Sequence, residues 1–328
     1  MRVYLTGGTG LLGSHLAAEL RAEGHDVVAL HREGADTSFL VGLGCELVPG
    51  DVGDGPERLS IGMQSCTHLV HGAALVYTGG DWSQVRAVNV LGTDNVLRAA
   101  SAAGVRHAVH VSSVAVYGTV EGYVDESVPL ESDLPASDLY ARSKREAEQV
   151  ARRVERELGL PVTVVRPSAV YGERDRLMVP ALARILRSPL VPLFGSGDNT
   201  LPVVYAGNVA RAMILALEAQ RGEETFDLGL DAPLTQRELF QWLGRGLGRP
   251  PRLMPLHRSV VQGTVGLLTR LGVGTPGAAH LPLERVARLA LGENPYPSRR
   301  IRDELGWSPP YAHAEALERT GRWYATLT

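Results

Sequence analysis

Tyr140 and Lys144 are the residues of this 328-residue chain whose types and spacing point most directly to chemistry. They lie four positions apart in a stretch with a helical pattern, and residues at that spacing share one helix face. A free tyrosine hydroxyl has a pKa of about 10, so near neutral pH it is a weak acid and a weaker base. A close ammonium group favours the phenolate and lowers that pKa. The pair therefore predicts general acid/base chemistry.

Lys144 is also the only lysine among 33 basic residues, the rest being arginine. An arginine would keep the positive charge, but its wide planar fork differs from a compact ammonium that can also bond a ribose hydroxyl. In a chain that uses arginine elsewhere, this exception indicates a position where the two residues are not interchangeable. We therefore predict that Lys144 is functional.

Two further polar residues are expected near this pair. Ser113 follows the strand-like run 107–112, and the carboxyl ends of parallel strands border the ligand crevice. We choose Ser113 over Ser112 as the catalytic serine, whose hydroxyl would bond a substrate carbonyl or alcohol oxygen. Asn89, in a helical stretch, either steadies a water that leads from Lys144 to solvent or bonds only to local backbone.

A glycine-rich turn follows the first apolar run. Residues 6–13 read Thr-Gly-Gly-Thr-Gly-Leu-Leu-Gly and lead into a helical pattern. Gly7 permits a tight turn, Gly10 lets the backbone approach a pyrophosphate, and Gly13 allows close packing of helix on strand. The free N–H groups and the dipole at the start of the helix favour phosphates. Strand, turn and helix together predict a dinucleotide site.

The residue that recognises the adenosine ribose is expected about 20 positions further on, at the end of the second strand. A carboxylate there would hold the ribose hydroxyls of NAD, but this strand ends at His31 and Arg32 follows. A guanidinium suits a 2′-phosphate, so Arg32 favours NADP(H). NAD(H) stays possible if Arg32 is a solvated side chain beside Glu33. Asp51 is either an acceptor for the adenine amino group or a plain loop residue.

The elements that must position these residues alternate along the chain. Short apolar runs and longer helical patterns follow one another, which is typical of βαβ units and a parallel sheet. The expected strands are Val3–Thr6, Asp26–Leu30, Glu46–Pro49, His68–Gly72, His107–Ser112 and Val162–Arg166. The expected helices, each followed by a glycine that stops it, are Leu11–Glu23, Gln84–Ala103 and Asp138–Leu158. Six strands with crossover helices predict an α/β fold with a Rossmann-like, doubly wound parallel sheet.

The rhythm changes after Pro167. Residues 172–202 are richer in proline and loop signals, a strand and helix resume over 203–218, and helical patterns with several prolines follow from Asp231. We predict a cofactor domain over residues 1–171 and 203–228, and a smaller, mainly helical substrate domain over residues 172–202 and 229–328.

Composition excludes several classes of protein. The net charge of −3 lacks the basic excess of proteins that bind nucleic acid or anionic membranes. Every apolar run is shorter than the roughly 18 residues of a membrane helix, and no signal peptide is read. Cys45 and Cys66 give neither a disulfide framework nor a metal site, and the histidines near two inner strands lack accompanying carboxylates. We expect a cytoplasmic protein without a metal.

These residues together resemble the extended branch of the short-chain dehydrogenase/reductases. The resemblance covers nearly the whole chain, including the glycine loop 6–13, the runs 166–172 and 304–307, and the catalytic group. It implies hydride transfer at the nicotinamide C4, with Tyr140 as acid/base, Lys144 on the nicotinamide ribose and Ser113 orienting the substrate oxygen. It also implies a homodimer. The further cofactor contacts it implies are Thr9, Leu11, Leu12, Val52, Ala73, Ala74, Pro167 and Val170.

Three departures distinguish members of this family. Sugar-nucleotide dehydratases have an Asp-Glu pair after the catalytic serine, where this chain has Val114 and Ala115. Many nucleotide-sugar epimerases have a diphosphate-binding arginine before the re-entering strand, where this chain has Leu201. Epimerases also hold NAD through an acidic residue, whereas Arg32 indicates an exchangeable NADP(H).

The departures favour an NADP(H)-dependent oxidoreductase that acts on a small-molecule ketone or secondary alcohol, similar to hydroxysteroid dehydrogenases and dihydroflavonol reductases. The segments 253–255 and 259–268 would then line an apolar substrate pocket or a membrane-facing lip, or else pack within their own domain. A nucleotide-sugar epimerase with tightly bound NAD is the first alternative. A non-catalytic NADP(H)-sensing protein is the second, although the intact catalytic group argues against a sensor.

Overall fold

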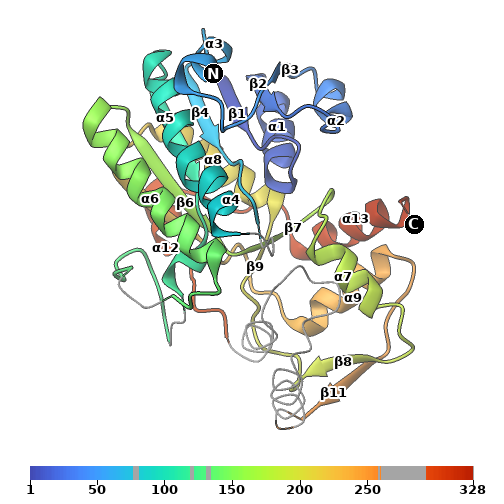
Figure 1. Ribbon diagram of the computed structural model, residues 1–328. Helices are drawn as coiled ribbons and strands as arrows, with labels where there is room; N and C mark the ends of the chain where they lie inside the picture. Colours follow the sequence, from blue (N-terminus) through green and yellow to red (C-terminus); the bar gives the residue numbers. More distant parts are fainter. Residues whose placement is uncertain (77–80, 119–121, 131–133, 258, 260–292, 328) are drawn as a thin grey trace.

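A seven-stranded parallel sheet forms the centre of the computed structural model, which describes residues 1–76, 81–118, 122–130, 134–257, 259 and 293–327 (Figure 1). The strand order is β10-β6-β5-β4-β1-β2-β3. The strands are β1 (Arg2–Thr6), β2 (Asp26–His31), β3 (Glu46–Pro49), β4 (His68–His71), β5 (His107–Val111), β6 (Val162–Pro167) and β10 (Glu224–Leu228). The order reverses between β1 and β4, so the crevice of a doubly wound sheet lies at their carboxyl ends. The predicted fold class is confirmed.

Helices cover both faces of this sheet (Figure 1). One buried core joins the sheet to α1 (Leu11–Ala22) and α8 (Ala206–Ala219). The other joins it to α3 (Pro56–Gly62), α5 (Gly92–Ala102) and α6 (Leu139–Leu158). The strands are apolar almost throughout because both faces of a parallel sheet are buried.

Six strands of the sheet lie where the sequence predicts them, and their ends differ by one residue at most. The predicted number of strands was wrong, because the sheet has a seventh. The seventh, β10, pairs with β6 and buries Phe226 and Leu228. The buried Asp227 interrupts its apolar pattern, and hydrophobic periodicity therefore did not reveal it.

The helix predicted over Gln84–Ala103 is present as one helical run, but it is not a single α-helix. The structure has α4 (Trp82–Arg86), a π-helical turn (Ala87–Leu91) and then α5. A one-turn widening barely disturbs the spacing of apolar residues, so the sequence pattern does not show it. The turn contains Asn89.

The remaining elements form a smaller region. β7 (Ala169–Tyr171) pairs with β9 (Val203–Tyr205), and β8 (Val191–Phe194) pairs with β11 (Leu253–Leu256). A third core gathers α7 (Met178–Ile185), α9 (Gln236–Gly246) and α13 (His313–Ala325) (Figure 1). The short helix α2 (Ser38–Gly42) belongs to the sheet region and buries Leu40 in the first core. The segment 253–255, which we expect to line a pocket or a lip or to pack within its own domain, lies in strand β11, and its role stays a prediction.

Two expectations for the C-terminal half stay open. Residues 260–268, the rest of the predicted apolar lining, lie outside the described residues. The division of the chain into two domains also stays a prediction. Helix α12 (Arg299–Leu305) falls in the predicted substrate domain, but it packs on β10 and α8, which belong to the predicted cofactor domain.

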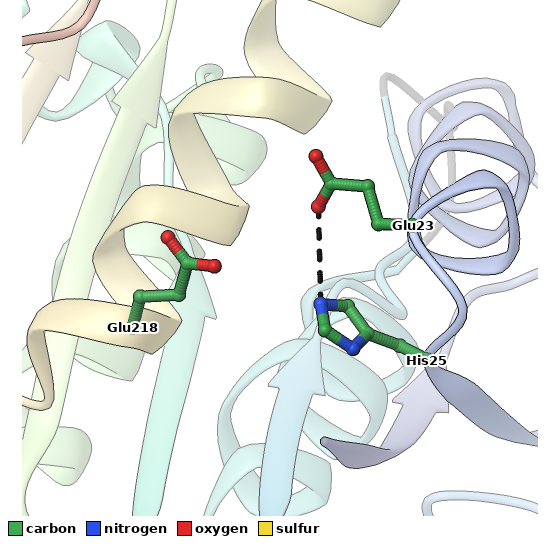
Figure 2. Close-up of side chains that lie close together, drawn as sticks. All are labelled: Glu23, His25 and Glu218. Atoms are coloured by element: carbon green, nitrogen blue, oxygen red, sulfur yellow. Dashed lines mark ion pairs between the residues drawn. The ribbon is translucent and has the colours of Figure 1, made fainter.

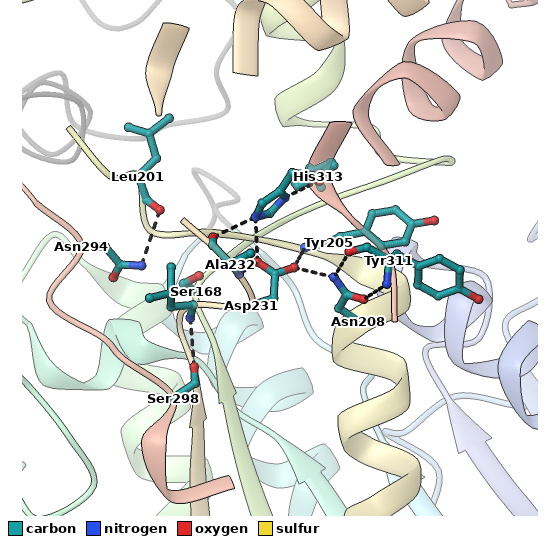
Figure 3. A network of polar contacts seen from close by, with 12 residues as sticks. Ser168, Leu201, Tyr205, Asn208, Asp231, Ala232, Asn294, Ser298, Tyr311 and His313 are labelled. Atoms are coloured by element: carbon teal, nitrogen blue, oxygen red, sulfur yellow. Dashed lines mark hydrogen bonds and ion pairs between the residues drawn. The ribbon is translucent and has the colours of Figure 1, made fainter. Parts of the chain in front are cut away.

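A buried polar network ties β9 and α8 to the last part of the chain (Figure 3). The Asp231 carboxylate accepts hydrogen bonds from the Tyr205 N–H (2.9 Å) and from Asn208 Nδ2 (2.8 Å), and it lies 2.9 Å from His313 Nε2. Asn208 also bonds the backbone of Tyr311 through both ends of its amide. Burial raises the pKa of Asp231, but these partners outweigh burial and hold the pKa below its usual value.

In the described part of the chain, no helix combines the length and the apolar character that crossing a bilayer requires.

Candidate active site

Helix α6 positions Tyr140 and Lys144 on one face, as their spacing predicts. Asp138 caps its start by accepting from the Ala141 N–H at 3.0 Å. The Lys144 Nζ lies 5.9 Å from the centre of the Tyr140 ring and donates to the Val111 carbonyl, at the end of β5, at 2.8 Å. This bond therefore attaches α6 to the carboxyl end of a central strand.

The Lys144 ammonium is buried with little compensation. Its side chain is 4% exposed, and Val111 supplies the one acceptor that the described residues place within hydrogen-bond distance of Nζ. Burial lowers the pKa of Lys144 to about 8, while the nearby Glu148 opposes this effect. An ammonium has three donors, so two are left for a tyrosine oxygen and a ribose hydroxyl.

Ser113 directly follows β5. It caps a short 3-10 turn (Val114–Tyr117), in which its Oγ accepts from the Ala115 N–H at 3.2 Å. That bond uses a lone pair and leaves the hydroxyl hydrogen to donate to a substrate oxygen. Ser112 is more deeply buried, at 3% exposed against 9% for Ser113. The choice of Ser113 stays a prediction.

Asn89 holds two segments together. Its Oδ1 accepts from the Leu75 N–H (2.7 Å), and its Nδ2 donates to the Leu75 carbonyl (3.0 Å) and to Ser143 Oγ (2.9 Å). Ser143 in turn donates to the Tyr140 carbonyl at 2.8 Å. Asn89 thus clamps the segment after β4 to α6, one residue before Lys144. The water that we predict beside Asn89 stays a prediction.

Sequence reasoning missed a hydrogen-bonded chain through His71. The His71 ring lies 2.8 Å from Thr6 Oγ1 and 3.0 Å from Thr93 Oγ1. Thr93 donates its hydrogen to the Asn89 carbonyl, so His71 Nε2 must donate to Thr93 and Nδ1 must accept from Thr6. Thr6 also accepts from the Ala73 N–H. Burial lowers the pKa of His71 to about 3, which keeps the ring neutral.

This chain links the first strand, the segment after β4 and the turn that holds Asn89. The only sequence signal was a histidine at the end of an inner strand, which we interpret from sequence as structural. The contact with Thr93 could not be predicted, because it joins elements 22 residues apart.

The glycine loop has the shape that a dinucleotide requires. Gly7 has φ +77°, and a Cβ at Gly13 would lie 2.2 Å from the Gly7 carbonyl oxygen. Gly10 stands at the start of α1 without a side-chain cap, so the first N–H groups of the helix are left for a ligand. The next residues along the helix are Leu11 and Leu12. The loop therefore fits a pyrophosphate, as predicted.

The residues predicted at the adenosine end lie after β2 and β3. Arg32 is exposed and has no carboxylate within ion-pair distance in the described chain. Asp51 is half-buried, with one oxygen accepting from the Gly53 N–H at 2.8 Å. Val52 is 5% exposed, and a Cβ at Gly92 would lie 2.8 Å from its Cγ2. The roles of these residues stay predictions.

The remaining predicted cofactor contacts lie around the carboxyl ends of the central strands. Ala73 and Ala74 follow β4, Pro167 ends β6, and Val170 lies in β7. The structure thus brings them to the same edge of the sheet as Ser113.

Sequence reasoning also missed one group of potential metal ligands (Figure 2). Glu23, His25 and Glu218 offer ligand atoms that lie within 4.8 Å of one another. Glu23 also pairs with Arg211, and His25 Nδ1 is 3.0 Å from the N-terminal amino group. Glu23 and His25 follow the end of α1, and Glu218 lies in α8. Two of the three members, Glu23 and His25, are already engaged by these partners, so the group does not support a metal assignment.

Comparison with known proteins agrees with this geometry. The sequence pattern of the NAD dependent epimerase/dehydratase family matches residues 3–229. A 4-hydroxy-2-methyl-3-oxo-4-farnesyl-3,4-dihydroquinoline-1-oxide ketoreductase of Stigmatella aurantiaca is 30% identical over 321 residues, which cover 97% of this chain and 95% of the relative. A UDP-glucose 4-epimerase of Mycolicibacterium smegmatis is 26% identical over 352 residues, which cover 99% and 98%.

The same agreement extends to solved structures. A dTDP-glucose 4,6-dehydratase from Streptomyces venezuelae, with NAD bound, is similar with a TM-score of 0.75 and 28% identity, over 99% of this chain and 97% of that one. The resemblance inferred from the sequence is confirmed. Reductases and sugar-modifying enzymes both lie among the relatives, so the comparisons leave the reaction to be argued from the site.

Proposed function

Because this chain belongs to the NAD-dependent epimerase/dehydratase family, the extended short-chain dehydrogenase/reductases, we propose that it is an NADP(H)-dependent oxidoreductase that interconverts a ketone and a secondary alcohol. The observation that carries the proposal is the environment of Leu201. This side chain stands where the resemblance implies a diphosphate-binding arginine, and it is 7% exposed in the apolar core of the smaller region. That position offers no cation to a nucleotide-sugar diphosphate.

The residues after Ser113 support the same conclusion. Val114 and Ala115 are 8% and 2% exposed, and both are apolar. Sugar dehydration needs an acid and a base at these two positions, according to the resemblance. This chain has neither, so dehydratase chemistry is not expected.

The catalytic residues act on one substrate oxygen. In the reductive direction the Tyr140 hydroxyl gives its proton to the carbonyl oxygen, while the Lys144 ammonium stabilises the phenolate that remains. The Ser113 hydroxyl donates to the same oxygen and orients the carbonyl. The nicotinamide, when bound, supplies the hydride in this direction and accepts it in the other.

The proposed preference for NADP(H) rests on Arg32. A guanidinium on the 2′-phosphate is a charge-assisted hydrogen bond, which contributes roughly 1.5–3 kcal/mol and thus a preference of about 10- to 100-fold. We expect Arg32→Asp to remove this preference, measured as the ratio of the dissociation constants of NADPH and NADH. A variant that keeps the parent ratio would show that Arg32 does not contact the phosphate.

A cofactor-retention assay and a substrate screen test the reaction. The purified protein is dialysed, and its bound nucleotide is measured before and after. The dialysed protein is then screened with ketones and nucleotide sugars in the presence of NADPH or NADH. An exchangeable cofactor and net NADPH oxidation with a ketone are expected, whereas retained NAD and turnover of a UDP- or dTDP-sugar without net oxidation would overturn the proposal.

A nucleotide-sugar epimerase is the second candidate, favoured by the UDP-glucose 4-epimerase relative that matches along the whole chain. We also propose that the protein is a cytoplasmic homodimer, as the family resemblance implies. Light scattering after size-exclusion chromatography tests the dimer.

A further inference from the structure

Arg174 lies beside the start of α1, in the segment that follows β7. Its Nε donates to Ser14 Oγ at 2.8 Å, and Ser14 Oγ itself donates to the carbonyl of Leu11, the first residue of the helix, at 2.9 Å. The guanidinium carbon lies 3.8 Å from the centre of the Phe39 ring, in α2. A hydrogen bond on one side and a ring on the other therefore fix the plane of this guanidinium.

The charge of Arg174 is left without a direct partner. In the part of the chain that the structure describes, no carboxylate lies within ion-pair distance of Arg174. Its neighbour Glu173 is committed elsewhere, because it accepts from Arg319 Nε at 2.6 Å and from the Tyr205 hydroxyl at 3.0 Å. Burial lowers the pKa of Arg174, and the charge of Glu173 only partly opposes this effect.

The lack of a carboxylate partner for Arg174 among the described residues is informative because this side chain lies near the start of α1. The start of a helix carries a partial positive charge, so a half-buried cation beside it is unfavourable unless an anion lies between them. Arg174 is half-buried and is held next to the glycine loop, where the first N–H groups of α1 are free. The arrangement becomes favourable when an anion occupies this position.

The position of Arg176 indicates which part of a bound dinucleotide would lie near Arg174. The pKa of the Asp36 carboxyl, after β2, is lowered mainly by hydrogen bonds from Ser38, and Arg176 lowers it further. Residues 174–176 therefore run along the segment 36–39, from the glycine loop toward the predicted adenosine end. The pyrophosphate is expected on the glycine loop, and Arg174 is the residue of this run that hydrogen-bonds to the first turn of α1, through Ser14.

We propose that Arg174 binds the pyrophosphate of the dinucleotide cofactor, together with the N–H groups at the start of α1. The guanidinium fork matches two phosphate oxygens, and its fixed plane means that little freedom is lost when the cofactor binds. The inference deepens the proposed function by adding a cofactor-binding residue. It rests on a dinucleotide cofactor and not on the identity of the ketone.

Binding measurements without any substrate test this assignment. Arg174→Gln keeps a polar side chain but removes the charge, and calorimetry gives its affinity for NADPH, NADH and ADP-ribose. All three probes contain the pyrophosphate, so we expect each to bind about 10- to 100-fold more weakly, the range for a charge-assisted hydrogen bond. Arg187→Gln is the matched control, because Arg187 is exposed on the smaller region, and its affinities should stay within about twofold of the parent.

Thermal unfolding separates binding from a structural role. Without cofactor, Arg174→Gln should melt at or above the parent temperature, because an uncompensated cation is removed. With saturating NADPH, its stabilisation should be smaller than that of the parent. A lower melting temperature without cofactor, together with unchanged affinity, would overturn the proposal and make Arg174 a structural tether.

Two further outcomes are decisive. A loss of affinity confined to NADPH would assign Arg174 to the 2′-phosphate and overturn the pyrophosphate contact. Weaker binding of all three probes would support it even if every ketone failed as a substrate. The failure of this inference is thus distinct from the failure of the proposed reaction.

Discussion

The polar cluster around Lys144 and the network around Asp231 are both buried, but their charges are paired very differently. Asp231 contacts a backbone N–H, an amide and an imidazole, and the pKa of its carboxyl lies below the usual value despite burial. Among the described residues, the Lys144 ammonium has one hydrogen-bond acceptor, the Val111 carbonyl, and burial lowers the pKa of Lys144 to about 8. One charge is satisfied by the fold and the other is not.

This difference in pairing distinguishes a network that stabilises the fold from a cluster that is a candidate for binding a ligand. Buried polar groups are costly unless they are hydrogen-bonded, and folds satisfy nearly all of them. A group that keeps spare donors is thus a candidate for contact with something that the chain itself does not supply. By this criterion the network of Figure 3 is a structural joint, whereas the cluster at the end of β5 is a candidate site.

The largest expected effect is on activity at the catalytic cluster. Tyr140→Phe removes the proton donor, and we expect the rate of ketone reduction to fall by about 10²- to 10⁴-fold. The dissociation constant of NADPH and the melting temperature should change little. Steady-state rates and calorimetry on the same preparation check both statements. Activity that survives this substitution would refute the assignment of the acid.

The structural joint should show the opposite pattern. Asp231→Ala leaves the Tyr205 N–H and the Asn208 amide without their acceptor. We expect a loss of about 2–6 kcal/mol in the free energy of unfolding, because each buried donor left unsatisfied costs about 1–3 kcal/mol. The turnover number per folded molecule should remain that of the parent. Urea unfolding and active-site-normalised rates measure the two quantities, and an unchanged unfolding free energy would remove the contrast.

Replacing the buried cation should cost activity without costing stability. Lys144→Met removes the charge that favours the phenolate, so we expect slower reduction and a melting temperature at or above that of the parent. The parent should lose kcat/KM as the pH rises through about 8, because the ammonium loses its proton there. Lys144→Arg should move this loss to higher pH. A pH profile with the same break in both proteins would exclude Lys144 as its cause.

A smaller effect is expected at a third buried network. The Tyr117 hydroxyl donates to Asp227 at 2.7 Å and accepts from Arg166 at 2.7 Å, and Arg166 also forms a two-pronged pair with Glu148. Burial raises the pKa of Asp227 to about 7, and the charge of Glu126 adds to this.

The sign of the pH dependence follows from that shift. Between about pH 4 and 7 the folded protein holds a proton that the unfolded chain has released. Asp227 therefore contributes stability that is present at low pH and is lost as the pH rises through 7. Asp227→Asn should flatten this slope and melt higher than the parent at pH 8. Melting curves from pH 4 to 8 test it, and parallel curves for the two proteins would contradict it.

Patterns over short stretches of the sequence predicted the features that depend only on residues close together in the chain. The glycine loop, the six strands and the helix that carries Tyr140 all follow from spacing of a few residues. The strand β10 was missed because Asp227 interrupts its apolar run, and the π-helical turn was missed because the apolar spacing around it is nearly helical. Contacts such as those of Arg174 with Ser14 and Phe39 join distant segments, and no periodicity records them.

The most direct test of the proposed reaction follows a labelled hydrogen. The protein is incubated with a ketone from the screen and NADPH that carries deuterium at the transferable C4 position, and NADPH loss is measured alongside product. Our account predicts equal amounts of NADPH consumed and alcohol formed, with deuterium on the carbinol carbon and product formation slowed by about 10²- to 10⁴-fold in Tyr140→Phe. Conversion of a nucleotide sugar to its epimer, with no NADPH consumed and no deuterium in the product, would contradict it.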